Sequence, residues 1–245
     1  KCTPWIRHKC RQHVKIGVYP EYGRPLDFKG IAEFIRKGKV DGSLKYREVR
    51  GGYHDAADYD RRPIHIPIAR ELCRVYEMNS GAFIDQQFII PESGNGLPDI
   101  LDEASFLLSY YLETQWADGG IPGGSEGTGH PFTDAHPGNA WRSNTENESV
   151  EYIMRPVSGY SCFAFAASAA QLGRVLQGFP RGRQHGDRLV SAAKRAFACG
   201  IRKFAPVKIS EEIAVAEAAA ELLHATGEVD YAAAINRLPT IKTAK

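Results

Sequence analysis

The chain has 245 residues, 43% of them hydrophobic, and a formal net charge of only +2. This composition is typical of a globular protein with one large domain or two small ones. The small net charge gives no electrostatic reason to expect nucleic acid or a membrane as a partner, and no apolar run is long enough to cross a bilayer. We therefore expect a globular protein with neither partner. We also expect a monomer.

The N-terminal part of the chain, residues 1–50, is basic and punctuated by glycine and proline, and we expect it to be irregular. Helical periodicity then begins. Pro63 or Pro67 predicts a helix start, and this helix should run to about Met78, where residues 79–81 (Asn-Ser-Gly) stop it.

A second helix is predicted after Pro98, which we place at its first helical position. The apolar residues recur there at helical spacing: Ile100, Leu101, Ala104, Leu107, Leu108, Tyr111 and Leu112. The acidic residues of its first turns suit the positive end of the helix dipole. Residues 117–149 follow as a long Gly/Pro/Asn-rich connection, whose histidines and aromatic residues indicate a functional loop.

The rest of the chain reads as further helices. Residues 158–176 are apolar almost all round, which is the pattern of a fully buried helix. Helices over 187–203 and 210–225 follow, and a short one begins near Glu228. Buried and amphipathic helices that alternate in this way favour layers of helical hairpins.

The five cysteines are odd in number and form no Cys-x-x-Cys pair, so neither a zinc knuckle nor a disulfide framework is indicated. Three of them lie in helical patterns and are predicted to be small core residues: Cys73, Cys162 and Cys199.

Residues 51–62 (GGYHDAADYDRR) are the most informative stretch of the sequence. Three carboxylates lie within six residues, at Asp55, Asp58 and Asp60, beside a histidine and two tyrosines. Sugar hydrolysis requires acid–base carboxylates, together with flat aromatic faces for the sugar ring. A Gly-Gly turn followed by an acid-capped helix N-terminus explains the same residues, so they leave both interpretations open.

Three blocks of the sequence resemble motifs of family 9 glycoside hydrolases, the endoglucanase family. Residues 51–59 resemble Gly-Gly-Trp-(Tyr/His)-Asp-Ala-Gly-Asp-Tyr, although Tyr53 replaces the usual Trp and Ala57 the usual Gly. Residues 92–104 resemble the segment that contains Asn-Gly-(Ile/Leu)-Pro-Asp-(Ile/Leu)-Leu-Asp-Glu, and residues 115–120 resemble Gln-x-x-Asp-Gly-Gly.

The resemblance implies an all-α fold, the (α/α)6 barrel or six-hairpin toroid, in which six inner helices are ringed by six outer ones. We expect an incomplete barrel, with about half of it present. Residues 1–245 would then be the N-terminal portion of a longer catalytic domain, with an irregular part over 1–50 and helical hairpins over 51–245.

The resemblance also implies a glycoside hydrolase that cleaves β-1,4-glucan bonds with inversion. At matching positions, Asp58 is the general base and Asp55 orients the water. His54, Arg61 and Arg62 are candidate donors that keep the base ionised, although each arginine is more often a solvated surface charge. The general acid, a Glu in an Asn-Glu segment, has no match and is expected outside this chain, which alone should be nearly inactive.

Five residues are predicted to bind the sugar: Tyr53, His54 and Tyr59 near the aspartates, and His136 and Trp141 in the long loop. The loop match is loose, and Trp141 could equally pack its own loop. No cofactor is required. Some family members carry structural calcium, but no ligand set can be assigned here, and the three aspartates do not fit an EF-hand.

The expected partner is a polysaccharide or oligosaccharide, and the expected location is extracellular or periplasmic, although the chain has no signal peptide. One rival interpretation is a non-catalytic carbohydrate-binding pseudoenzyme on the same scaffold. Another is an unrelated α/α toroid that uses the aspartates for a metal or a lyase reaction.

Overall fold

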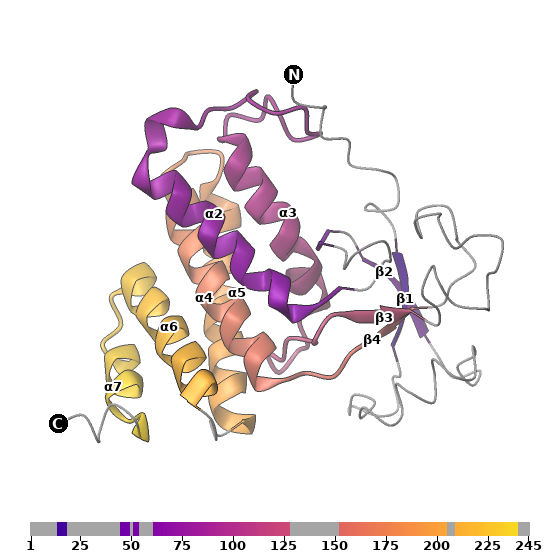
Figure 1. Ribbon diagram of the computed structural model, residues 1–245, viewed down its shortest axis with the longest axis vertical. Helices are drawn as coiled ribbons and strands as arrows, with labels where there is room; N and C mark the ends of the chain where they lie inside the picture. Colours follow the sequence, from indigo (N-terminus) through magenta and orange to yellow (C-terminus); the bar gives the residue numbers. More distant parts are fainter. Residues whose placement is uncertain are drawn as a thin grey trace.

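The computed structural model describes residues 14–18, 45–49, 51–53, 61–127, 152–204 and 209–239. The strands are β1 (Val14–Val18), β2 (Lys45–Val49), β3 (Ser125–Gly127) and β4 (Tyr152–Met154). The helices are η2 (Pro63–His65), α2 (Ile66–Met78), η3 (Ser80–Ala82), α3 (Asp99–Thr114), α4 (Gly159–Gln177), α5 (Arg183–Lys203), α6 (Ile209–Thr226) and α7 (Asp230–Asn236). Figure 1 shows the α-helices packed together, with the small sheet at one side of them.

The predicted helices are all present, with small differences at their ends. The first ends at Met78, as predicted. Pro98 is the N-cap of α3 and not its first helical residue, because its ψ of 130° is extended. The helix predicted over 187–203 begins earlier, at Arg183, within the turn that follows α4.

The four strands form one sheet in the order β2-β1-β4-β3. Strand β1 is antiparallel to β2 and parallel to β4, and β3 is antiparallel to β4. Two of these strands lie in residues 1–50, which were expected to be irregular. Each is only five residues long, so its period-2 pattern is too short to stand out from the surrounding sequence.

Helix α4 lies at the centre of the described helices and packs against α2, α3, α5 and α6. Its side chains are buried almost throughout, which confirms the predicted buried helix. Ser158 caps it in a capping box with Ser161, satisfying backbone donors that would otherwise be lost in the core. Cys73, Cys162 and Cys199 are free and fully buried, as predicted.

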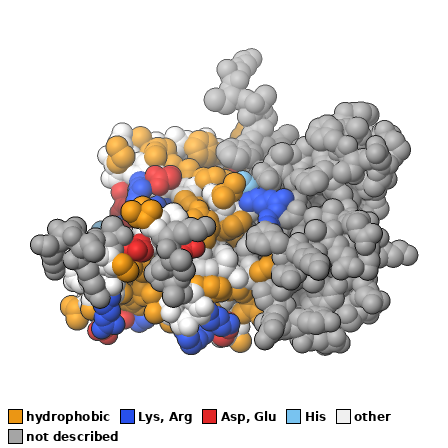
Figure 2. Space-filling view, turned by 60° about the horizontal axis from the view of Figure 1, so that its bottom comes forward, with side chains coloured by type: hydrophobic (Ala, Val, Ile, Leu, Met, Phe, Trp, Pro, Cys, Tyr) orange, Lys and Arg blue, Asp and Glu red, His pale blue; other side chains and the backbone are white. Residues whose placement is uncertain are grey.

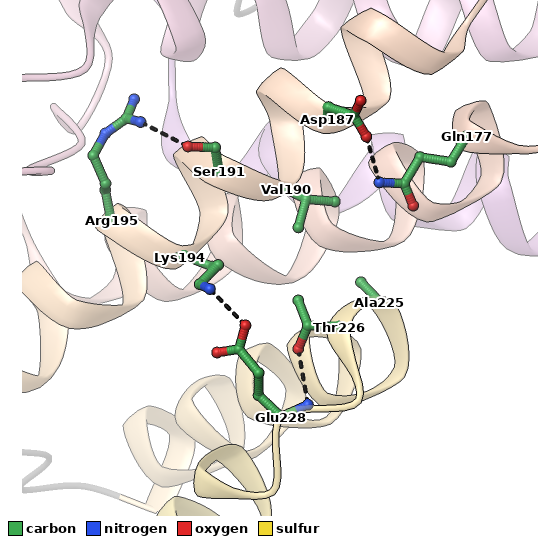
Figure 3. A pocket seen from close by; sticks show the side chains of 9 residues that line it. All are labelled: Gln177, Asp187, Val190, Ser191, Lys194, Arg195, Ala225, Thr226 and Glu228. Carbon is green, nitrogen blue, oxygen red and sulfur yellow. Dashed lines mark hydrogen bonds and ion pairs between the residues drawn. The ribbon is translucent and has the colours of Figure 1, made fainter.

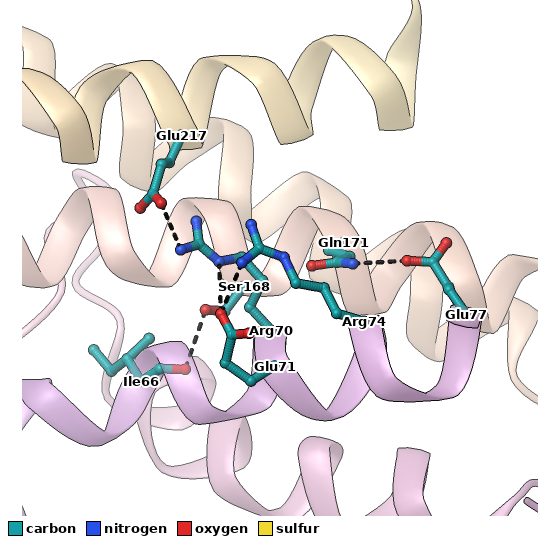
Figure 4. A network of polar contacts seen from close by, with 8 residues as sticks. All are labelled: Ile66, Arg70, Glu71, Arg74, Glu77, Ser168, Gln171 and Glu217. Atoms are coloured by element: carbon teal, nitrogen blue, oxygen red, sulfur yellow. Dashed lines mark hydrogen bonds and ion pairs between the residues drawn. The ribbon is translucent and has the colours of Figure 1, made fainter. Parts of the chain in front are cut away.

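A polar network crosses the surface where α2, α4 and α6 meet (Figure 4). Arg70 of α2 pairs with Glu217 of α6 at 2.7 Å, and Glu77 of α2 pairs with Arg174 of α4 at 2.7 Å. In the first pair, the Arg70 side chain is 7% exposed and the Glu217 side chain 42%. The network therefore joins the two helices that flank α4.

Apolar side chains stand beside charged ones on the described part of the surface (Figure 2). Ile68 and Val75 of α2 and Ile213 of α6 are exposed. None of the helices in the described ranges combines the length and the apolar character needed to cross a membrane.

Candidate active site

Gly51 and Gly52 bring the start of the acidic segment, residues 51–62, directly against α3. Both have positive φ, +76° and +78°, a backbone conformation that glycine adopts most easily. A Cβ on Gly51 would lie 1.8 Å from Ser109 Oγ and 2.4 Å from the Phe106 carbonyl oxygen. The Gly52 N–H donates to that carbonyl at 3.1 Å. Only glycine fits this close approach.

Tyr53, the next residue along the chain, is bound to the same helix through its side chain. Its hydroxyl donates to Glu103 Oε1 at 2.6 Å, a short bond of the kind made to a carboxylate. Its ring is half-buried and packs against the hydrophobic core. Glu103, expected only to suit the dipole of α3, therefore has a specific partner in the segment. The predicted role of Tyr53 in binding sugar stays a prediction.

Arg61 closes the other end of the segment. Its side chain is fully buried, so the expectation of a solvated surface arginine is wrong for this residue. Its Nε donates to the Gly51 carbonyl at 2.9 Å, and its guanidinium carbon lies 4.9 Å from the centre of the Tyr110 ring. Its backbone N–H and C=O both pair with Ser125 at 3.1 Å. The Gly51 carbonyl and the Tyr110 ring offset part of the hydration that the guanidinium loses on burial.

Tyr110 is a fully buried partner of Arg61 on α3. Burial raises the pKa of its hydroxyl to about 12, and the positive charge of Arg61 offsets part of that rise. The hydroxyl therefore stays neutral at any working pH, and the ring presents its electron-rich face to the cation. The neighbouring Tyr111 donates from its hydroxyl to the Arg62 carbonyl at 2.9 Å, which adds a contact to the same end of the segment.

The other predicted site residues lie outside the described residues: His54, Asp55, Asp58, Tyr59, His136 and Trp141. Their predicted roles stay predictions. The structure describes the contacts that hold the chain on either side of residues 54–60, and we call these contacts the frame. The sequence reasoning missed Glu103 and Tyr110 as parts of this frame, because both are separated in sequence from the segment that they hold.

The second motif shapes the loop that leads into α3. Asp99 is buried and accepts hydrogen bonds from the backbone N–H groups of Gln86 and Phe88, at 3.1 and 2.5 Å, and from Ser93 Oγ at 3.0 Å. Asp102 accepts one from Asn95 Nδ2 at 2.9 Å. These residues were expected to suit the helix dipole, and the structure shows that they also fold the preceding loop.

The third motif turns the chain from α3 toward α5. Gln115 Nε2 donates to the Ala192 carbonyl at 2.9 Å, and Asp118 forms an ion pair with Lys203. Gly119 has a φ of +94°, and a Cβ there would lie 2.2 Å from the Arg195 carbonyl oxygen. The second and third motifs therefore build the support for α3, which in turn holds the acidic segment.

A pocket of about 520 Å³ lies elsewhere, between α5 and the ends of α4 and α6 (Figure 3). Its charged side chains already have partners: Lys194 contacts Glu228 at 2.5 Å, Asp187 accepts from Gln177 at 2.8 Å, and Arg195 donates to Gln115 Oε1 at 2.5 Å. It contains no residue of the three motifs. Within the described ranges, no group of three or more His, Cys, Asp or Glu side chains is arranged to hold a metal.

Comparisons with known proteins agree with the motifs. The model of the family described as Glycosyl hydrolase family 9 matches residues 17–244. Endoglucanase C of Cellulomonas fimi is 29% identical over 94% of this chain and 22% of its own length. A cellulose 1,4-beta-cellobiosidase of Acetivibrio thermocellus is 31% identical over 53% of this chain and 15% of its own.

A solved structure has the same fold. The crystal structure of a metagenome-derived glycoside hydrolase family 9 endoglucanase aligns with a TM-score of 0.69 and 25% identity, over 81% of this chain and 37% of that one. This agreement confirms the predicted helical architecture, an incomplete (α/α)6 barrel. The chain spans less than half of the solved chain and less than a quarter of either curated relative.

Proposed function

Because the chain belongs to glycosyl hydrolase family 9, we propose that it forms the water-activating part of an enzyme that hydrolyses β-1,4-linked glucans such as cellulose. The observation that carries the proposal is the family match over residues 17–244, which includes all three motifs. The names of the curated relatives, an endoglucanase and a cellulose cellobiosidase, support the substrate class.

The proposed reaction inverts the anomeric carbon. Asp58 takes a proton from water, Asp55 holds and orients that water, and a carboxylic acid on the opposite side protonates the leaving oxygen. Two carboxylates at i, i+3 can lie on one face of a helical turn and bind the same water. We place the general acid in a part of the protein that this sequence does not include, since the sequence spans only 37% of the solved relative.

The substrate would be a polysaccharide or oligosaccharide, held by aromatic and histidine side chains: Tyr53, His54, Tyr59, His136 and Trp141. Cellulose is an insoluble polymer that stays outside cells, which supports an extracellular or periplasmic location. Activation of water by two carboxylates needs no cofactor, and no ligand set is assigned to structural calcium. We propose that the enzyme acts as a monomer.

The test is Asp58→Asn in the product of the full coding region. We expect the rate of cello-oligosaccharide hydrolysis to fall about 10²–10⁴-fold, the usual contribution of acid–base catalysis. Binding of the oligosaccharide, measured by calorimetry, should persist, because Asn keeps the size of the side chain. Asp60→Asn is the matched control in the same segment and should retain activity. Proton NMR of the first product should show the inverted anomer.

Two results would contradict the proposal. Sugar binding without any turnover by the unmodified protein would favour a carbohydrate-binding pseudoenzyme. Loss of turnover on adding a chelator would favour a metal-dependent reaction in place of the proposed activation of water by two carboxylates.

A further inference from the structure

Arg61 directly follows residues 54–60, and its side chain returns to the residue that begins the acidic segment. The hydrogen bond from Arg61 Nε to the Gly51 carbonyl, at 2.9 Å, joins two residues ten positions apart. The two ends of the segment that carries Asp55 and Asp58 are therefore held together by one side chain.

Arg61 is itself fixed from several sides. It is fully buried, its backbone pairs with Ser125 in both directions, and its guanidinium lies against the Tyr110 ring. Gly124 has a φ of +96°, and a Cβ there would lie 1.8 Å from the Arg61 carbonyl oxygen, so the chain approaches Arg61 as closely as glycine permits. The backbone of Arg61 is therefore fixed by Ser125 and Gly124, and its guanidinium is held by the Gly51 carbonyl and the Tyr110 ring.

Helix α3 anchors the beginning of the segment as well. The Gly52 N–H donates to the Phe106 carbonyl at 3.1 Å, and the Tyr53 hydroxyl donates to Glu103 at 2.6 Å. Both ends of the segment are thus attached to one regular helix, which positions groups more precisely than a loop does.

We infer that Arg61 is a positioning residue for the two aspartates. This inference rests on the proposed function. By joining the two ends of the segment that carries Asp55 and Asp58, Arg61 limits the positions that the two proposed reacting groups can take. Its effect is expected on the chemical step, because a displacement of about 1 Å in a reacting group can lower a rate about 10²-fold.

The kinetic test compares Arg61→Met, Arg61→Lys and Arg70→Met in the product of the full coding region. Arg61→Met should lower kcat about 10²-fold and raise KM by much less, because two of the proposed sugar contacts, His136 and Trp141, lie outside the segment. Arg61→Lys should recover much of kcat, since its ammonium can still donate to the Gly51 carbonyl. Arg70 is the matched control, a buried arginine paired with Glu217 at 2.7 Å, and Arg70→Met should leave kcat unchanged.

A second readout does not depend on activity. Amide hydrogen exchange of residues 51–62, followed by mass spectrometry, should be faster in Arg61→Met than in the unmodified protein, and unchanged in Arg70→Met. If the unmodified protein has no turnover, the proposed function fails, and the exchange of this segment alone decides whether Arg61 holds it. An unchanged exchange, or an unchanged kcat in an active enzyme, would overturn the positioning role.

Discussion

Asp102, in the first turns of α3, has a buried carboxyl group whose pKa is raised. Asn95 Nδ2 donates to one of its oxygens at 2.9 Å. Burial, assisted by the carboxylates of Glu92, Asp99 and Asp85, raises its pKa to about 7, against the opposing effect of Asn95. The folded protein thus keeps a proton that the unfolded chain, with an Asp pKa of about 3.9, releases. Stability should therefore fall as the pH rises through this window, from about 4 to about 7.

Asp102→Asn should remove this pH dependence. We expect the free energy of unfolding at pH 8 to rise by about 1–3 kcal/mol and to change little near pH 4, where the carboxyl of the folded protein is already neutral. Urea unfolding at both pH values, monitored by circular dichroism, measures this free energy. Asp85 is the control of opposite sign, because the N–H groups of Gly94 and Gly96 lower its pKa. Asp85→Asn should destabilise at pH 8. No gain in Asp102→Asn at pH 8 would contradict the prediction.

At the scale of elements, α4 and α5 are brought together by small residues. A Cβ on Gly186 would lie 2.5 Å from the Gly173 carbonyl oxygen, and a Cβ on Gly173 would lie 2.7 Å from a methyl carbon of Val190. The two helices therefore touch through their backbones. A side chain larger than hydrogen at either glycine would have to displace the facing helix, because protein interiors are close-packed.

Gly186→Ala tests this packing. Alanine favours a helix over glycine by about 1 kcal/mol, but the added methyl group must push α5 away from α4, which typically costs about 1–3 kcal/mol. We expect a net loss of stability, seen as a lower thermal midpoint. At Gly81 an added methyl group would meet no atom within 4 Å, and the backbone there is outside the left-handed region, so Gly81→Ala should be neutral. A stabilised Gly186→Ala would show that the helices can separate freely.

At the scale of the whole molecule, the pair between Arg70 and Glu217 links helices whose residues are 147 positions apart. The two partners differ in exposure, at 7% for Arg70 and 42% for Glu217. Removing Glu217 leaves the buried Arg70 cation without the carboxylate that it pairs with, whereas removing Arg70 leaves a carboxylate that water can reach. The two substitutions should therefore have unequal effects.

We expect Glu217→Ala to lower the free energy of unfolding by about 1–3 kcal/mol and Arg70→Met to lower it less. Chemical unfolding of the two single variants and the double variant gives the comparison. The double variant should resemble Arg70→Met, since Glu217 no longer has Arg70 to neutralise. Equal losses in the two single variants would mean that the exposure of the partners does not decide the outcome.

The sequence alone determined the helices and the family. Helix positions follow from local periodicity and from capping residues a few positions apart, so they can be read along the chain. The three motifs are contiguous, and the assignment of Asp55 and Asp58 as the reacting pair depends on them alone and stays a prediction. The short strands of residues 1–50 were not foreseen, because each depends on pairing with a distant partner.

Only the tertiary structure decided the surroundings of the acidic segment. Arginine is a residue type usually found on the surface. Arg61 is buried because Ser125 and Tyr110, both far along the chain, fold against it, and its side chain then joins the two ends of the acidic segment. Glu103 likewise meets Tyr53 across 50 positions. Burial and pairing depend on which distant segments of the chain contact one another, and the local sequence around a residue does not determine those contacts.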